Sequence, residues 1–258
     1  MDVDLVKSGI TGDIGGKIFY YETVGSTNTA ALEIAGRTEE GAVVISDSQT
    51  KGRGRLGRCW ISPPGVNIYL SIILRPGIES GHITLLTLMS AVALAHALKK
   101  TAGLAVSVKW PNDLMVADRK LGGILSEAKI SGKHIVHAVI GAGVNVNMDA
   151  GDFPDEIRAI ATSVKHETGK NFPREPVVSE ILNETDRWYK ILQGGRSGEI
   201  LSEWQRLSST LGRNVLVVSG LETYSGLAEA IDEGGMLLVR IPSGEIKRIS
   251  SGDLTVLK

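Results

Sequence analysis

Short runs rich in apolar and β-branched residues follow one another along most of this chain, with few helical patterns between them. Consecutive strands that lack connecting helices usually pair in antiparallel fashion. The pattern therefore predicts an α+β fold with a mixed, largely antiparallel β-sheet and helices packed on it. The expected strands are residues 17–23, 42–47, 66–74, 106–110, 114–116, 123–129 and 135–146.

Helical patterns occupy two longer stretches. Residues 84–99 are mostly apolar or small, and the run is shorter than a membrane span needs, so we interpret it as a buried helix. Residues 176–206 have helical spacing with aromatic anchors. A further helix is expected after Ser26–Asn28, because these side chains are suited to capping a helix N-terminus.

The character of the chain changes after Leu211. Four short β-type runs follow, separated by glycine and serine. A segment of about fifty residues with this pattern suits a small β-barrel. We therefore predict a large domain at residues 1–210 and a small C-terminal β-barrel domain at residues 211–258.

Composition excludes several classes of protein. With 28 basic and 29 acidic residues the formal net charge is −1, which gives no long-range field to attract nucleic acid. Cys59 is the single cysteine, so an intrachain disulfide or a thiolate metal cluster is impossible. The N-terminus lacks the apolar core of a signal peptide. We expect a cytoplasmic protein with no membrane segment.

The residues at 52–57, GRGRLG, match the GxGxxG pattern of dinucleotide-binding loops. That use needs a strand before the glycines and a helix directly after them. Here CWISPPGVN follows, with two prolines and then a strand, so the sequence argues against a dinucleotide site. The chain also has no GxxxxGKS/T phosphate loop and no protein-kinase signature.

The same loop interleaves Arg53, Arg55 and Arg58 with glycines. Glycines let backbone N–H groups approach an anion, and guanidinium groups are forked donors suited to phosphate and carboxylate. Trp60 follows, and its indole is able to stack on a base. Taken alone, the loop is better described as a solvated basic segment, but Trp60 favours the anion-binding interpretation.

Three further groups of residues have candidate roles. Asn112 and Asp113, in a proline turn beside Lys109, have the oxygen atoms that Mg²⁺ prefers, although Pro-Asn-Asp is also a common turn. Lys120 precedes paired glycines and is able to reach a phosphate, or is an exposed turn lysine. Asn145 lies in GAGVNVN, where it either binds a ligand or ends a strand.

Together these segments resemble the biotin–protein ligase family. The resemblance rests on STN (26–28), QTKGRGRLGRCW (49–60), KWPNDLMV with DRKLGGILSE (109–127) and GAGVNVN (141–147). It covers residues 17–148 strongly and the C-terminal segment more weakly. It implies a catalytic domain related to class II aminoacyl-tRNA synthetases and lipoate ligases. It also implies ATP-dependent formation of biotinyl-5′-adenylate and transfer of biotin to one lysine of a biotin carboxyl carrier protein.

The resemblance also implies roles for individual residues. Those expected at biotin are Ser26, Thr27, Asn28, Gln49, Gly52, Arg53, Gly54, Arg55, Lys120 and Gly123. Those expected at ATP or the adenylate are Arg55, Arg58, Trp60, Asn112, Lys120 and Asn145. The expected catalytic residues are Arg53, Lys120 and Asp113. Asn112 is the candidate for Mg²⁺, held through the substrate phosphates.

Two positions depart from the family pattern, and several alternatives stay open. Leu56 stands where many members have arginine and Cys59 where lysine is frequent, which puts the retention of the adenylate in doubt. The rival functions are a lipoate or octanoate ligase and a non-catalytic biotin sensor. A DNA-binding repressor is disfavoured, because the first motif begins at Ser26 and leaves no room upstream for a DNA-binding domain. A homodimer is expected from the family.

Overall fold

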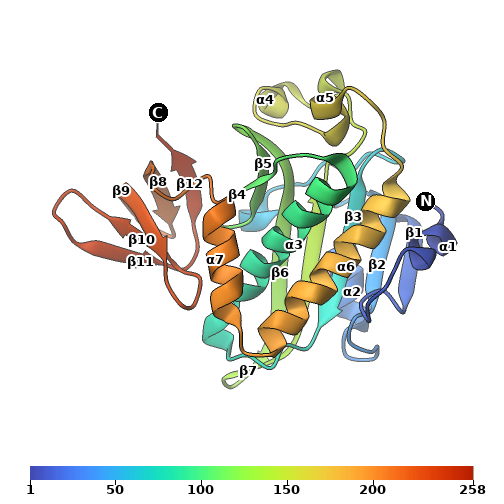
Figure 1. Ribbon diagram of the computed structural model, residues 1–258, viewed down its shortest axis with the longest axis horizontal. Coiled ribbons are helices and arrows are strands. Elements are labelled where there is room, and N and C mark those ends of the chain that lie inside the picture. Colours follow the sequence, from blue (N-terminus) through green and yellow to red (C-terminus); the bar gives the residue numbers. More distant parts are fainter. Residues whose placement is uncertain (258) are drawn as a thin grey trace.

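The computed structural model describes residues 1–257 and contains two β-sheets with helices packed mainly on the larger one (Figure 1). The helices are α1 (Val3–Ser8), α2 (Thr27–Ile34), α3 (Thr84–Ala102), α4 (Asp155–Arg158), α5 (Val164–Thr168), α6 (Arg174–Gln193) and α7 (Ser197–Leu207). The short 3-10 turns are η1 (Arg55–Gly57), η2 (Ser80–His82) and η3 (Ala150–Asp152).

The larger sheet has the strand order β1-β2-β3-β7-β6-β5-β4. Only β1 and β2 pair in parallel, and every other neighbouring pair is antiparallel. The prediction of a mixed, largely antiparallel sheet is therefore confirmed. Its strands are β1 (Ile18–Val24), β2 (Val43–Gln49), β3 (Ile68–Leu74), β4 (Ser107–Lys109), β5 (Asp113–Val116), β6 (Arg119–Ser131) and β7 (His134–Val144).

One face of this sheet is covered by α3, α6 and α7, which lie in front of the strands in Figure 1. The α3 sequence is apolar almost all round because the helix packs between the sheet and the other two helices. Ser80–Ala102 is long and apolar enough to cross a membrane by length and composition, but 67% of its most apolar window is buried inside the protein. The expected buried helix is confirmed.

The opposite face of the sheet is covered only in part. There α2 packs its alanines onto the sheet in a small cluster with β2, β3 and β7. Residues at alternate positions of a strand point to the same face, and Val139 is the β7 residue that lies under α2. Further along the same face of β7 the residues are Gly141, which lies under Asn28 at the start of α2, and Gly143, which lies under Trp60 of a loop. This uncovered half of the face is where a cavity forms.

The C-terminal strands form an open sheet, so the expected closed barrel is wrong. Their order is β11-β10-β9-β8-β12, and the two edge strands do not pair with each other. Only residues 250–252 link β11 to β12, and such a link reaches at most about 15 Å, so the sheet curls strongly without closing. The strands are β8 (Asn214–Ser219), β9 (Glu222–Ile231), β10 (Leu237–Arg240), β11 (Ile246–Ile249) and β12 (Asp253–Val256). The domain boundary at residues 210 and 211 stays a prediction.

Several boundaries also differ from those predicted. The helical region 176–206 is two helices, because the chain turns at Gly195, whose φ is 72°. The strand expected at 123–129 is longer and begins at Arg119. The strand expected to reach residue 146 ends at Val144, so the asparagines that follow lie beyond it.

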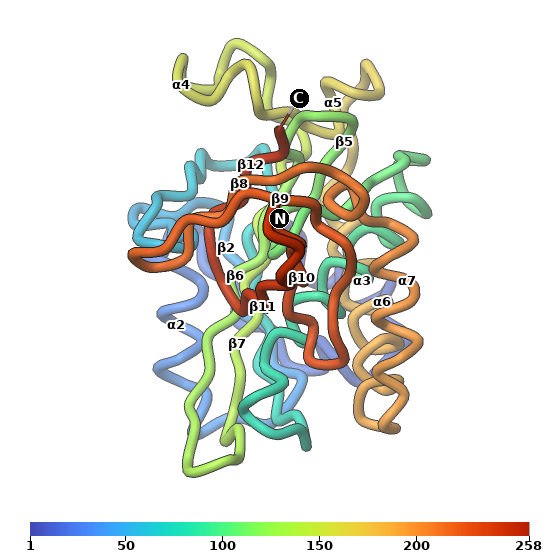
Figure 2. The backbone as a smooth tube through the Cα atoms, turned by 90° about the vertical axis from the view of Figure 1, so that its left-hand side faces the viewer, coloured from blue at the N-terminus to red at the C-terminus, as the bar shows by residue number. Residues whose placement is uncertain are grey.

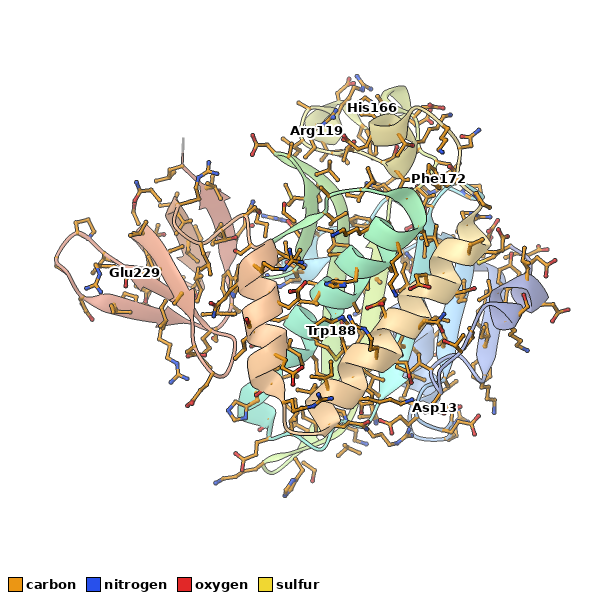
Figure 3. All side chains as sticks on the ribbon, in the orientation of Figure 1. Asp13, Arg119, His166, Phe172, Trp188 and Glu229 are labelled. Carbon is orange, nitrogen blue, oxygen red and sulfur yellow. The ribbon has the colours of Figure 1, made fainter. Side chains whose placement is uncertain are left out.

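An ion-pair cluster ties α7 to α3. The Glu203 carboxylate lies 2.6 Å from His96 Nε2 and accepts a 2.8 Å hydrogen bond from Arg206 Nε. His96 also contacts Trp188 edge-on, with ring centroids 5.6 Å apart; Trp188 is marked between α6 and α3 in Figure 3. The hydrogen bond from Arg206 is the main cause that lowers the pKa of Glu203 to about 2.

We expect Glu203→Gln to lower the free energy of unfolding at pH 7 by about 1–2 kcal/mol. A carboxylate whose pKa is depressed by folding stabilises the folded state above its unfolded pKa, and the effect disappears as the pH falls through the folded value. The difference between Glu203→Gln and wild type should therefore shrink between about pH 4.5 and pH 2. Urea denaturation across this range measures it.

Glu199→Gln is the matched control on the same helix. Its carboxylate pairs with Arg196, and both side chains are more than half exposed. Such a pair contributes little, so this variant should stay within about 0.5 kcal/mol of wild type. A Glu203→Gln difference that does not change with pH would show that the ion pair is not its source.

Candidate functional site

A cavity of about 510 Å³ lies on the uncovered half of the large sheet. Its walls come from segments far apart in sequence: the start of α2, the loop after β2, the β4–β5 turn, the first half of β6, the end of β7, residues between 145 and 161, and the start of β12. Figure 2 shows the C-terminal sheet lying across the side of the larger sheet, beside the loop that follows β2. The cavity therefore lies where the two sheets and this loop meet.

Glycines form much of the cavity floor. Gly123 of β6 pairs with Gly143 of β7, and Leu125 pairs with Gly141. A Cβ atom at Gly143 would lie 2.5 Å from the Trp60 indole, and one at Gly141 would lie 2.0 Å from Asn28 Oδ1. These glycines are required because two side chains from other segments rest directly on the strand backbone.

One end of the cavity is a buried network of uncharged polar groups. Gln49 Oε1 accepts a 2.8 Å hydrogen bond from the Thr27 backbone N–H, and Gln49 Nε2 donates a 2.9 Å bond to Ser62 Oγ. Ser71 Oγ donates a 2.6 Å bond to Asn28 Oδ1. The network fixes the orientation of two amide side chains in the cavity wall, as expected of a site that recognises an uncharged polar group.

The start of α2 contributes to the same end of the cavity. Ser26 is the N-cap residue and is 4% exposed, but its side chain makes no capping hydrogen bond. Ser26 is thus one of the three residues that the sequence offered as caps, but its hydroxyl does not cap the helix. Ser26, Thr27 and Asn28 all line the cavity, and all three are buried.

The glycine–arginine loop is a folded hairpin. Gly54 N donates to Arg58 O at 2.7 Å, and Trp60 N donates to Gly52 O at 3.0 Å. The turn is made by Leu56 and Gly57, which have φ values of 55° and 73°. Leucine rarely adopts this conformation, so Leu56 holds a strained, exposed position at the cavity rim.

Each arginine of the loop has a different partner. Arg53 forms an ion pair with Glu127 of β6. Arg55 donates to Asn112 Oδ1 and to the Gly252 carbonyl, both at 3.3 Å, and burial lowers its pKa. The loop is thus tied both to the large sheet and to the segment that begins β12.

Arg58 makes the second connection to the C-terminal sheet. It forms a bidentate pair with Asp253, in which its NH1 group donates to Oδ1 at 3.2 Å. The hydrogen bond from Arg58 is the main cause that lowers the pKa of the Asp253 carboxyl. The sequence showed no sign of this contact, because nothing local relates the two residues.

Lys120 lies at the middle of the cavity. Its Nζ is 2.5 Å from Asp113 Oδ1 and 5.8 Å from the centroid of the Trp60 ring. Asp113 and Lys120 are brought together because β5 and β6 pair with each other through the turn between them. The structure therefore joins two of the predicted catalytic residues in one ion pair.

The two asparagines have different surroundings. Asn112 Nδ2 donates a 2.7 Å hydrogen bond to Ile124 O, and Asn112 Oδ1 accepts one from Arg55. Asn145 is 5% exposed, and its Nδ2 donates to Thr162 O at 3.0 Å. Both residues line the cavity while holding neighbouring backbone in place.

An apolar wall closes one side of the cavity, and sequence reasoning missed it. The residues are Met148, Phe153, Ile157, Ile160 and Ala161. The Lys120 backbone pairs with Ala161 in parallel, which holds this segment beside β6. Arg119 donates a 2.8 Å hydrogen bond to Glu167 and lies 2.6 Å from His166 Nε2. Arg119 and His166 are labelled at the top of Figure 3.

Every residue predicted for the site lines this cavity except Gly52. A Cβ atom at Gly52 would lie 2.3 Å from the Trp60 carbonyl oxygen, so this glycine allows the hairpin to close. Sequence reasoning missed Ser62, Ser71 and Glu127, which hold the predicted residues in place. The sequence did contain one signal for this packing: Gly141 and Gly143 alternate along the strand, which leaves space for side chains from other segments.

The cavity offers oxygen atoms for a cation but no protein cage. Residues 1–257 contain no group of three histidine, cysteine, aspartate or glutamate side chains placed to hold a metal ion. Asn112, Asp113 and Asp118 line the cavity. Such a donor set fits Mg²⁺ that enters bound to substrate phosphates, because Mg²⁺ keeps few protein ligands in sites of that kind.

Residues 20–145 match a family described as the biotin/lipoate A/B protein ligase family, and residues 210–254 match a biotin protein ligase C-terminal domain. The chain is 34% identical over 251 residues to the bifunctional ligase/repressor BirA of Bacillus subtilis, covering 96% of this chain and 77% of that protein. It is 33% identical over 226 residues to the biotin–[acetyl-CoA-carboxylase] ligase of Paracoccus denitrificans, covering 85% of this chain and 92% of that protein.

A solved structure of Aquifex aeolicus biotin protein ligase in complex with biotin and ATP has a similar fold. Its TM-score is 0.82 at 28% identity, and the match covers 94% of this chain and 100% of that chain. The similarity includes the large sheet and the C-terminal segment. Relatives above 30% identity are matched over most of their length, and this chain therefore belongs to the biotin protein ligase family.

Proposed function

We propose that this protein activates biotin with ATP and transfers it to one lysine of a biotin carboxyl carrier protein. The observation that carries the proposal is the Lys120–Asp113 ion pair in a cavity with an uncharged polar network at one end and three loop arginines at its rim. Membership of the biotin ligase family supports the same reaction. The cavity volume of about 510 Å³ is within the range of small-molecule sites.

We assign the uncharged end to the biotin head group. Thr27, Asn28 and Gln49 are fixed by their mutual hydrogen bonds and by two serines. Fixed donors and acceptors lose little entropy on binding a polar ligand, which favours a defined orientation. Gly123 then exposes strand backbone between this end and Lys120, so that the biotin carboxylate is directed toward the lysine.

The first step joins two anions. A biotin carboxylate oxygen attacks the α-phosphorus of ATP, the bond to the pyrophosphate oxygen breaks, and pyrophosphate leaves. Lys120, Arg53 and Arg58 reduce the repulsion between the carboxylate and the phosphates and stabilise charge in the transition state. In the structure these cations are paired with Asp113, Glu127 and Asp253, so their positions are fixed before the substrates bind.

In the second step the uncharged amine of the carrier lysine attacks the acyl carbon of the adenylate. The bond from this carbon to the phosphate oxygen breaks and AMP leaves, while the amine loses a proton. Asp113 is our candidate to orient the amine or accept this proton, because it lies 2.5 Å from Lys120 Nζ at the centre of the cavity. Closure of the loop would keep water from the labile adenylate.

We assign adenine to the apolar wall and to Trp60. Phe153, Ile157 and Ile160 provide an apolar surface, and the Trp60 indole lies against Gly143 in the same cavity. Mg²⁺ is the metal that we expect, bound mainly by the ATP phosphates with Asn112 as the nearest protein ligand. It would neutralise phosphate charge.

We also propose a homodimer, a cytoplasmic location and no specific DNA binding. Strand β1 is an unpaired edge of the large sheet, and such an edge is able to supply an interface. The single cysteine fits a reducing compartment, and the net charge of −1 provides little attraction for DNA. Sedimentation velocity with and without biotin would test the homodimer. A DNA-binding titration would test the lack of specific DNA binding.

Mass spectrometry of a carrier domain tests the proposed function. The carrier is incubated with this protein, Mg-ATP and, in separate reactions, biotin, lipoate or octanoate. We expect addition of the biotin mass only. Addition of lipoate or octanoate in preference to biotin would favour the alternative acyl ligase, and binding of biotin without AMP formation would favour a non-catalytic sensor.

Lys120→Ala should reduce biotin-dependent adenylate formation by at least about 10³-fold, because the cation at the reacting phosphate is lost. Pyrophosphate release measures this step without a carrier. Lys165→Ala is the control, since this lysine pairs with Asp149 outside the cavity lining. Pyrophosphate release at the wild-type rate by Lys120→Ala would refute the assignment.

Asp113→Ala should slow transfer to the carrier more than it slows adenylate formation. Single-turnover measurements separate the two steps: pyrophosphate release reports the first, and biotinylation by preformed adenylate reports the second. Lys120 keeps its charge in this variant, so the first step should fall by less than about tenfold. Equal slowing of both steps would contradict this division of roles.

Gly143→Ala should weaken binding of both ATP and biotin by at least about tenfold. The new Cβ would lie 2.5 Å from the Trp60 indole and would displace it from the cavity floor. Isothermal titration measures each affinity. Gly151→Ala is the control, because nothing lies within 4 Å of a Cβ atom there. Unchanged affinities in Gly143→Ala would show that Trp60 is not needed at the floor.

A further inference from the structure

Glu127 is a carboxylate beside the cavity: it is not itself a lining residue, but it contacts two of them, Asn28 and Arg53. The proposed reaction assigns it no chemical step. It belongs to β6 and pairs in register with Val139 of β7, so it points to the same face of the sheet as the cavity floor. Its side chain is 28% exposed. A carboxylate close to bound anions repels them. The negative charge of Glu127 must therefore be offset by donors or cations that contact it.

The compensating interaction joins two different parts of the site. Glu127 Oε2 accepts a 2.9 Å hydrogen bond from Asn28 Nδ2, and the same oxygen pairs with the Arg53 guanidinium. Asn28 belongs to the buried network at the start of α2, whereas Arg53 belongs to the hairpin loop. One carboxylate oxygen therefore links the head-group end of the cavity to the loop that borders it.

This contact completes the hydrogen bonding of the Asn28 amide. Asn28 Nδ2 donates to Leu125 O at 3.1 Å as well as to Glu127, and Asn28 Oδ1 accepts from Ser71. Gly141 provides the space in which the amide lies. With both N–H donors engaged, the amide has one orientation, and its oxygen presents its remaining lone pair in a fixed direction.

Arg53 is also the loop arginine that contacts the central strands of the large sheet. Arg58 and Arg55 instead contact Asp253 and Gly252 of the C-terminal segment, and Arg55 also contacts Asn112 in the β4–β5 turn. Without the Glu127 contact, the hairpin would keep the contact of Arg55 with Asn112 and the packing of Trp60 on Gly143, but Arg53 would lose its charged partner on β6. Glu127 holds Arg53 more firmly than an uncharged acceptor would, since a charge-assisted hydrogen bond is stronger than a neutral one.

We propose that Glu127 is a positioning residue that couples closure of the loop at residues 52–58 to the head-group end of the cavity. The inference rests on the proposed function. Glu127 touches neither reacting group; it acts through Arg53 on the loop and through Asn28 on the head-group pocket. Its effect is on how long the adenylate is retained and how well biotin is oriented.

Two substitutions separate these two actions. Glu127→Gln keeps an oxygen acceptor for Asn28 but removes the charge that holds Arg53. We expect it to release biotinyl-5′-adenylate about tenfold faster while the biotin Kd stays within about twofold of wild type. Glu127→Ala removes both contacts and should also raise the biotin Kd by about tenfold. Stopped-flow fluorescence and isothermal titration measure these quantities.

A double-mutant cycle tests whether Glu127 acts on the loop through Arg53. Arg53→Ala alone should speed adenylate release, and Glu127→Gln in the Arg53→Ala background should add less than about twofold. Arg53→Lys, which keeps the charge, should restore part of the retention. Independent, multiplying effects of the two substitutions on release would overturn the coupling.

Glu229→Gln is the matched control. Glu229 forms a similar partly exposed pair with Arg240 on the C-terminal sheet, far from the cavity, where Figure 3 labels it. Thermal unfolding of each variant shows whether the fold is kept. If wild type forms no adenylate, the proposed function fails. If wild type forms it and Glu127→Gln releases it at the wild-type rate, the proposed function stands and this inference is wrong.

Discussion

The site depends on bare backbone at two alternate positions of β7. Asn28 and Trp60 rest on Gly141 and Gly143 at distances that a Cβ atom would prevent. Asn28 is the centre of the buried polar network, and Trp60 is the residue on which Lys120 places its ammonium group. A single methyl group at either glycine would therefore displace one end of the cavity, because the strand is held rigidly by pairing on both sides.

Charge in the cavity is arranged in pairs before any substrate is present. Lys120 is paired with Asp113, Arg53 with Glu127 and Arg58 with Asp253. Each pair fixes a cation at the cavity rim or centre while reducing the repulsion between neighbouring cations. When anionic substrates bind they compete with these carboxylates, so the acids set both the position of each cation and the strength of its field.

The C-terminal sheet forms part of the candidate site. Gly252 and Asp253 line the cavity and hold the two arginines at the far side of the hairpin. Leu56, whose backbone is left-handed, forms the turn between these two arginines. Its side chain is exposed and uncharged. Loop, sheet and cavity are thus one connected unit, and a change in the C-terminal segment is transmitted directly to the loop.

The sequence alone determined what local patterns can determine: the α+β class, most strands, the buried α3 helix, the family, and the polar and glycine residues of the motifs that line the cavity. It did not reveal the apolar wall of the cavity. It misjudged the closed barrel, because a pattern of short strands does not reveal whether edge strands pair. Only the tertiary structure decided that Arg53 meets Glu127, that Arg58 meets Asp253 and that Asn28 rests on Gly141. Such contacts depend on the path of the whole chain, which brings together residues that no local spacing relates.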